Sequence, residues 1–226
     1  MKLIKLNSLL FLCLFTIGCQ SSTKKDAQQA KAEADTIATI PQQDLSQYET
    51  AYFASGCFWC VEAVFESVKG VKEAVSGYAG GKEKNPTYEQ VGAGRTGHAE
   101  SVMVYYDPKE VSYETLVRVF FGSQDPTTLN RQGPDKGTQY RSIAFYKNED
   151  EKEIIERYIQ QLEDEKVFSK PIVTQVVPFE KFWKAEDYHQ NYERLHPDNP
   201  YVKNVSIPRL RKFQKKYPEL LKDNIH

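Results

Sequence analysis

The stretch from Tyr48 to Gly70 changes its periodicity once, and this change constrains the fold more than any other feature of the chain. Residues 48–55, YETAYFAS, have the composition of a β-strand. Beyond Gly56 the apolar residues recur at helical spacing, at Phe58, Val61, Val64, Phe65 and Val68. The sequence therefore predicts a strand that passes directly into a helix, with Cys57 at the junction, near the helix N-terminus.

The rest of the chain mixes strands and helices without a regular order. Strands are predicted at residues 72–81, 97–108, 141–146 and 171–177, and helices at residues 113–123, 149–162 and 185–195 and from Pro208 onward. Ser112 and Asn148 stand where two of these helices need an N-cap. Because strands and helices do not alternate as in a βαβ series, we expect the α+β class.

Two further segments bear on a possible site. Residues 124–140 form a long polar loop with no predicted structure, and such loops are usually functional or disordered, so we expect a site wall here. The strand at residues 97–108 alternates, and one of its faces carries His98, Glu100, Val102, Val104 and Tyr106. The alternation alone does not decide whether Glu100 points inward or outward.

The first residues have the pattern of a targeting segment. Lys2 and Lys5 precede an apolar run over residues 9–17, which is too short to span a bilayer and has the length of a secretory signal. The run ends in TIGC, which resembles the lipobox of bacterial lipoproteins, with Thr16 at the position where Leu is usual. We therefore expect residues 1–18 to be a signal peptide and Cys19 to carry the lipid.

The remaining chain divides into a tether and a domain. Residues 19–46 are rich in Ser, Lys, Gln, Ala and Asp, a composition that predicts a flexible tether, and residues 47–226 suit one catalytic domain. We expect a protein of a bacterial cell envelope, extracytoplasmic and lipid-anchored to a membrane. The net charge of −1 indicates no nucleic-acid partner, and we expect a monomer.

The pair Cys57 and Cys60, in GCFWC, is the centre of the possible chemistry. A helix N-terminus and a second cysteine one turn later both lower a thiol pKa, which predicts a nucleophilic Cys57 that can form a disulfide with Cys60. A structural zinc site needs four ligands, and the four histidines offer no finger-like spacing to this pair. A thioredoxin-like dithiol exchanger, a thiol enzyme acting on a small sulfur or acyl group, and a binding protein with two buried cysteines all remain open.

Seven short blocks in the order GCFWC, SGYAGG, NPTYEQV, GRTGHAE, YYDP, GTQYRS and AEDYHQ resemble peptide methionine sulfoxide reductases of the A type. The resemblance runs from about Tyr52 to Leu221. It implies reduction of methionine (S)-sulfoxide, free or in proteins, with no bound cofactor and no metal. It also implies a two-layer sandwich in which helices pack on a mixed sheet around a ferredoxin-like core.

The resemblance also implies roles for single residues. Cys57 matches the catalytic cysteine that attacks the sulfoxide sulfur, and Glu100 matches the carboxylic acid that donates a proton to the oxygen. The other matches are the methyl-binding aromatics Phe58 and Trp59, the oxygen-binding phenols Tyr88 and Tyr140, and Asp135, which contacts the substrate backbone. A sulfoxide is a poor electrophile until its oxygen is protonated or hydrogen-bonded, so a cluster of donors is what this chemistry requires.

The chain departs from the family pattern in its cysteines. Cys60 stands where many members have Gly, Gly92 stands where many have Cys, and residues 200–205 contain none. The resemblance therefore leaves Cys60 as the resolving cysteine, with a Cys57–Cys60 disulfide recycled by thioredoxin or another external dithiol. This implies a role in the repair of oxidised proteins. The alternative function is a general thiol–disulfide oxidoreductase.

Overall fold

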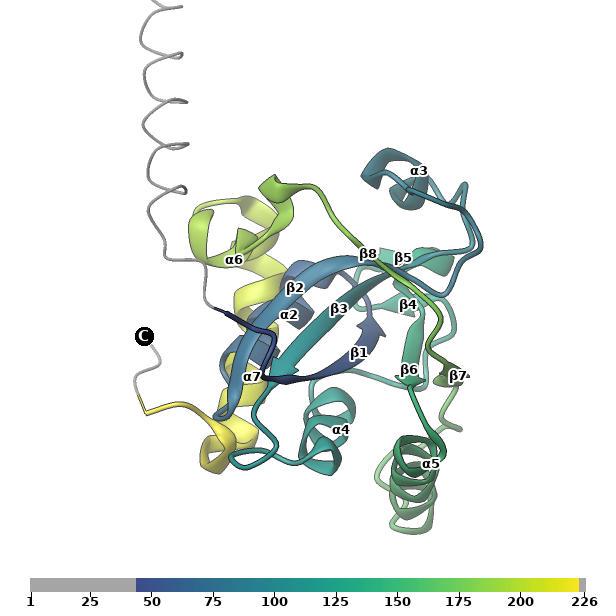
Figure 1. The fold of residues 1–226 in the computed structure, drawn as a ribbon, viewed down its shortest axis with the longest axis vertical. Coiled ribbons are helices and arrows are strands. Elements are labelled where there is room, and N and C mark those ends of the chain that lie inside the picture. The colour runs from purple at the N-terminus through teal and green to yellow at the C-terminus, as the bar shows by residue number, and fades with distance from the viewer. Residues whose placement is uncertain (1–43, 224–226) are drawn as a thin grey trace, which may run out of the picture. The chain divides into compact units, whose positions relative to one another are not determined.

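The computed structural model describes residues 44–223, and Figure 1 shows their arrangement. The signal peptide, Cys19 and most of the tether fall in residues 1–43, outside the described residues. Within the described part, no helix combines the length and the apolar character needed to cross a membrane.

Four strands and two helices form the centre of the fold. The strands are β1 (Glu49–Ser55), β2 (Val71–Ala79), β3 (Ala99–Tyr106) and β6 (Ser142–Tyr146). The helices are α2 (Phe58–Glu66), between β1 and β2, and α4 (Tyr113–Gly122), between β3 and β6. The strands lie in the order β6-β1-β3-β2 and are all antiparallel to their neighbours. This βαββαβ arrangement is the ferredoxin-like core that was predicted.

Two edge strands complete a mixed sheet. β7 (Gln175–Pro178) pairs parallel to β6, and β8 (Phe182–Lys184) pairs antiparallel to β2. The predicted α+β class and mixed sheet are therefore confirmed. β8 was not predicted, because three residues are too few for a clear alternating pattern.

The main core lies between the sheet and its helices. α2 packs against the sheet, with α4 and α7 (Ile207–Lys216) beside it and α5 (Glu149–Asp164) next to α4. The large buried side chains of this core include Phe53, Phe65, Leu116, Phe120 and Phe213. On the opposite face of the sheet Tyr52 stacks on Phe179, with 3.6 Å between ring centroids. The face of β3 that carries Glu100, Val102 and Val104 is the one that α2 covers.

Local signals in the sequence correctly placed two helix starts. The Ser112 hydroxyl accepts the Thr115 N–H at 3.1 Å at the start of α4, and the Asn148 side chain accepts the Glu151 N–H at 2.9 Å at the start of α5. Such caps depend only on residues three apart in the chain, which is why the sequence predicts them.

Residues 124–140 are not the structureless loop that was predicted. β4 (Arg131–Gln132) and β5 (Asp135–Lys136) form a short hairpin, and a 3₁₀ turn follows at Thr138–Tyr140. The side chain of Gln132 holds the loop together, since it accepts the Asp125 N–H at 3.1 Å and donates to the Asp125 carbonyl at 3.2 Å. These bonds join residues seven apart, and sequence composition does not reveal them.

The predicted helix at residues 185–195 is also wrong. The chain forms a 3₁₀ turn at Asp187–His189 and then a separate short helix α6 (Tyr192–Leu195), because Asn191 adopts a left-handed conformation with φ of +55°. The Gln190 amide between them bonds to both the N–H and the carbonyl of Ser76 on β2. The Asn191 N–H donates to the Glu62 side chain on α2 in place of a helical carbonyl.

Candidate active site

Cys57 lies at the junction that the sequence predicted, as the residue immediately before the first turn of α2. Gly56 precedes it with φ of +85°, and a Cβ placed there would lie 2.6 Å from the Gln132 Cβ. Only glycine fits both the conformation and the space. The end of β1 and Gly56 therefore place Cys57 at the N-terminus of α2.

Cys60 lies one turn further along α2, and both thiols are free and buried. The neighbouring Cys57 side chain acts on the pKa of the Cys60 thiol. It lowers the pKa of Cys60 to about 6, with further help from Arg209, Ser206 and Tyr201. Burial raises the pKa of Cys57, which is the opposite of the lowering expected from the helix N-terminus. Once the two thiols have lost one proton between them, the other proton can lie on either sulfur. Either cysteine can therefore be the thiolate.

Glu100 points into the protein rather than outward. Its side chain is 2% exposed, and its Oε2 accepts the Phe58 N–H of the first turn of α2 at 3.0 Å. Burial raises the pKa of Glu100 to about 8, so the carboxyl is neutral at pH 7. A neutral carboxyl beside Cys57 can donate a proton to an oxygen bound there.

Tyr88 and Tyr140 come from two different segments, and both phenols lie within reach of the charges of Glu100 and Cys57. Tyr88 begins α3 (Tyr88–Gly92), a short helix that was not predicted, and its N–H donates to Glu186 at 2.9 Å. Burial, followed by the Glu100 charge, raises the pKa of Tyr88 to about 12 and raises that of Tyr140 further. Both phenols therefore remain neutral hydrogen-bond donors, near Glu100 and Cys57.

Phe58 and Trp59 form an aromatic wall with residues from the C-terminal part of the chain. Trp59 stacks on Tyr192 with 3.8 Å between ring centroids and 8° between planes, and its indole N–H donates to His189 Nδ1 at 3.1 Å. Phe58 is fully buried and packs with Tyr88 and His189, at centroid distances of 6.2 and 5.0 Å. Burial lowers the pKa of His189 to about 4, so the ring is neutral and can accept the indole hydrogen.

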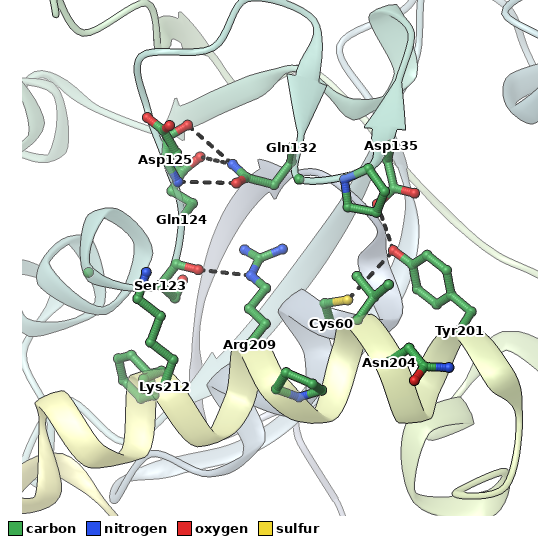
Figure 2. Close-up of a pocket in the computed structure, with 16 residues that line it drawn as sticks. Cys60, Ser123, Gln124, Asp125, Gln132, Asp135, Tyr201, Asn204, Arg209 and Lys212 are labelled. Carbon is green, nitrogen blue, oxygen red and sulfur yellow. Dashed lines mark hydrogen bonds between the residues drawn. The ribbon is translucent and has the colours of Figure 1, made fainter.

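The Tyr201 hydroxyl lies between the Asp135 carboxyl and the Cys60 sulfur and contacts both (Figure 2). Tyr201 donates its hydroxyl hydrogen to Asp135 Oδ2 at 2.6 Å, and its oxygen lies 3.8 Å from the Cys60 sulfur. Burial raises the pKa of Asp135.

A cavity of about 580 Å³ opens on the Cys60 side, between the β4–β5 hairpin and α7. Its wall includes Cys60, Asp135, Tyr201 and Arg209 but not Cys57. The Arg209 guanidinium donates to the carbonyls of Ser123 and Ser55 at 2.8 and 2.9 Å and to the Ser55 hydroxyl at 3.1 Å. These bonds tie α7 to the ends of α4 and β1, next to the Cys57 junction.

The structure brings every predicted site residue within residues 44–223 into one region. The described residues contain no group of three His, Cys, Asp or Glu side chains suited to a metal ion. A thiol pair with a neutral carboxyl and neutral phenols around it suits thiol-based redox chemistry, and these features define the class of protein as a thiol oxidoreductase.

Comparison with known proteins narrows this class. A family model described as peptide methionine sulfoxide reductase matches residues 49–221. The MsrA of Polynucleobacter asymbioticus is 46% identical over 182 residues, covering 80% of this chain and 96% of that protein. The MsrA of Sulfolobus acidocaldarius is 48% identical, covering 76% of this chain and 96% of that protein.

Solved structures agree in fold. Methionine sulfoxide reductase A of Corynebacterium diphtheriae superposes with a TM-score of 0.61 at 36% identity, covering 70% of this chain and 79% of that chain. Mxr1 of Saccharomyces cerevisiae in its reduced form gives 0.63 at 31% identity, covering 71% and 92%. The chain therefore belongs to the peptide methionine sulfoxide reductase family, and it is an oxidoreductase that reduces methionine sulfoxide.

Sequence reasoning missed the residues that support the site. They are His189 and Tyr192 beside Trp59, Tyr201 and Arg209 beside Cys60, and Glu186 beside Tyr88. His189 and Glu186 stand in the matched block AEDYHQ, which could have drawn attention to them. The other three carry no local signal, because they reach the site only through the fold.

Proposed function

We propose that this protein reduces the S epimer of methionine sulfoxide, free or in oxidised proteins, with Cys57 as the nucleophile and Glu100 as the proton donor. The observation that carries the proposal is the buried, neutral Glu100 carboxyl against the first turn of the Cys57 helix. The aromatic wall of Phe58 and Trp59 would receive the methyl group of the sulfoxide, and Asp135 would contact the substrate backbone.

The first step would transfer the oxygen to the enzyme. The shared proton moves to Cys60, and the Cys57 thiolate attacks the sulfoxide sulfur while Glu100 protonates its oxygen. Tyr88 and Tyr140 donate hydrogen bonds to that oxygen and stabilise the charge that develops on it. Methionine leaves, and the oxygen remains on Cys57 as a sulfenic acid.

The second and third steps would regenerate the thiols. Cys60 attacks the Cys57 sulfur, the S–O bond breaks, water leaves and a Cys57–Cys60 disulfide forms. A dithiol protein of the thioredoxin type then supplies two electrons through a mixed disulfide and releases both thiols. The short separation of the cysteines on one helix supports Cys60 as the resolving residue.

The direct test uses separated epimers. The purified protein is incubated with the S or the R sulfoxide of a methionine derivative and dithiothreitol, with Cys57→Ser as the inactive control. We expect the S epimer alone to be consumed. Reduction of insulin disulfides without consumption of either sulfoxide would instead establish a general thiol–disulfide oxidoreductase and contradict the proposal.

We also propose that Cys19 carries a lipid that anchors the enzyme to a membrane of the bacterial cell envelope. The support is the TIGC sequence after a short apolar run and the polar composition of residues 20–46. Oxidised envelope proteins would then be the substrates, and the reductant would be a thioredoxin-like protein of the same compartment.

A further inference from the structure

Two residues that hold Trp59 belong to one short segment, residues 186–192, and Tyr201 from outside it contacts the indole edge-on, with 6.0 Å between ring centroids. His189 accepts the indole hydrogen, and Tyr192 stacks on the indole ring. Between them the backbone adopts a left-handed conformation at Asn191, whose φ is +55°. The position of Trp59 therefore depends on what keeps this segment, and Asn191 in particular, in place.

A buried carboxyl of the active-site helix provides that contact. Glu62 lies on α2, three residues after Trp59, and is 2% exposed. One of its oxygens accepts the Asn191 N–H, and the other accepts the Ser76 hydroxyl hydrogen. One side chain thus connects α2, β2 and the segment that holds Trp59.

The segment has a second attachment at the same place. The Gln190 amide accepts the Ser76 N–H at 3.0 Å and donates to the Ser76 carbonyl at 3.1 Å and the Ala185 carbonyl at 3.1 Å. Gln190 therefore fixes the segment to β2, whereas Glu62 fixes it to α2, the helix that carries Trp59. Of these two attachments, Glu62 joins the Trp59 helix to the residues that hold Trp59.

We propose that Glu62 is a positioning residue for substrate binding, which sets the orientation of Trp59 by holding Asn191 and, with it, Tyr192 and His189. The inference rests on the proposed role of Trp59 as a wall of the methyl pocket. Without the carboxyl, the Asn191 N–H loses its partner, and the left-handed turn loses its hydrogen bond to α2. Trp59 then loses the fixed stack and hydrogen bond that keep the pocket in shape.

The test measures binding separately from chemistry. Single-turnover reduction of methionine (S)-sulfoxide by the pre-reduced full chain is followed against substrate concentration for Glu62→Ala, Glu62→Asp and Glu62→Gln. For Glu62→Ala we expect the half-saturating concentration to rise roughly 5- to 100-fold, as for a buried group that loses its partner, with the limiting rate little changed. The shorter side chain of Glu62→Asp cannot reach both partners. Its half-saturating concentration should lie between those of the wild type and Glu62→Ala.

Glu62→Gln should restore binding. Its amide oxygen can accept the Asn191 N–H, and its NH₂ group can donate to the Ser76 hydroxyl, which is free to rotate. Burial raises the pKa of Glu62 to about 8, so a neutral amide is the matched replacement at pH 7. The control is Glu66→Ala, which removes a carboxyl one turn further along the same helix, while the bonds of Asn191 and Ser76 go to Glu62.

A spectroscopic measurement reports on Trp59 itself. The chain has two tryptophans, so Trp183→Phe leaves Trp59 as the single emitter. In that background Glu62→Ala should shift the emission spectrum, and Glu62→Gln and Glu66→Ala should not. If Glu62→Ala does not fold, the ranking of Glu62→Asp below Glu62→Gln in affinity decides the question.

The outcomes separate this inference from the function on which it rests. An unchanged half-saturating concentration in Trp59→Ala would contradict the proposed methyl pocket. If the half-saturating concentration rises in Trp59→Ala but stays at the wild-type value in Glu62→Ala and Glu62→Asp, the role of Glu62 is overturned. An equal rise in Glu66→Ala and Glu62→Ala would also overturn it. A fall in the limiting rate alone would also overturn it, because positioning of Trp59 acts on binding.

Discussion

Replacement of Glu100 by Gln tests the proton-donor role most directly. The amide oxygen of Gln can still accept the Phe58 N–H, which wild-type Glu100 accepts at 3.0 Å, so the local fold should survive. The amide cannot give up a proton to the sulfoxide oxygen. Since general acid catalysis typically contributes ~10²–10⁴-fold, we expect the single-turnover rate at pH 7 to fall by roughly that factor.

The pH profile gives the same test a second, independent readout. With its pKa raised to about 8, Glu100 is about nine-tenths protonated at pH 7 and about one-tenth at pH 9. The pKa of Cys60 is lowered to about 6, so the pair carries its thiolate above that pH. The wild-type rate should therefore rise through pH 6, form a plateau and fall through pH 8. Glu100→Gln should lose the alkaline fall.

The assay is quenched-flow measurement of methionine formed by pre-reduced enzyme between pH 5 and 10. Glu153→Gln, an exposed carboxyl on α5, is the control for loss of one charge. A Glu100→Gln rate within tenfold of the wild-type rate at pH 7, or an alkaline limb that stays at the same pH in this variant, would refute the assignment of Glu100 as the proton donor.

The raised pKa of Glu100 also predicts how the stability of Glu100→Gln relative to wild type changes with pH. The folded-state pKa of Glu100 lies above its unfolded value of ~4.3, so the wild-type protein loses stability at this group as the pH rises from about 4.3 to about 8. The slope is ~1.4 kcal/mol per pH unit, and Gln does not titrate. The free energy of unfolding of Glu100→Gln relative to wild type, from urea titrations, should therefore increase across this window; a flat difference would contradict the raised pKa.

Three further results are expected. Cys60→Ser should yield about one methionine per enzyme in a single turnover and then stall as a sulfenic acid that a nucleophilic probe traps. Cys57→Ser should yield no methionine. Full thioredoxin-driven turnover by Cys60→Ser would exclude Cys60 as the resolving cysteine. Gly56→Ala should lower the free energy of unfolding by ~1–3 kcal/mol in urea titrations, because its Cβ would overlap Gln132 at a φ of +85°. Cys19→Ala should move the protein out of the detergent phase on partition, and unchanged partition would exclude lipidation at that residue.

Much of the site could be predicted from residues close together in the chain. The strand-to-helix junction, Gly56 and the two cysteines are consecutive, and their geometry follows from local conformational preferences. The same holds for the caps at Ser112 and Asn148, which bond three residues ahead. A resemblance carried by seven short blocks then led to Glu100, Tyr88, Tyr140 and Asp135, although no pattern indicated that Glu100 points inward.

Only the tertiary structure decided the environment of these groups. The balance of charge between Cys57 and Cys60 depends on burial and on Arg209 and Tyr201, which are more than 140 residues away in sequence. Trp59 is held by a segment whose predicted helix breaks at Asn191, where the backbone N–H donates to Glu62 and the Gln190 amide donates to the Ala185 carbonyl. A pKa or a left-handed turn depends on every group that surrounds it, and those neighbours come together only when the chain has folded.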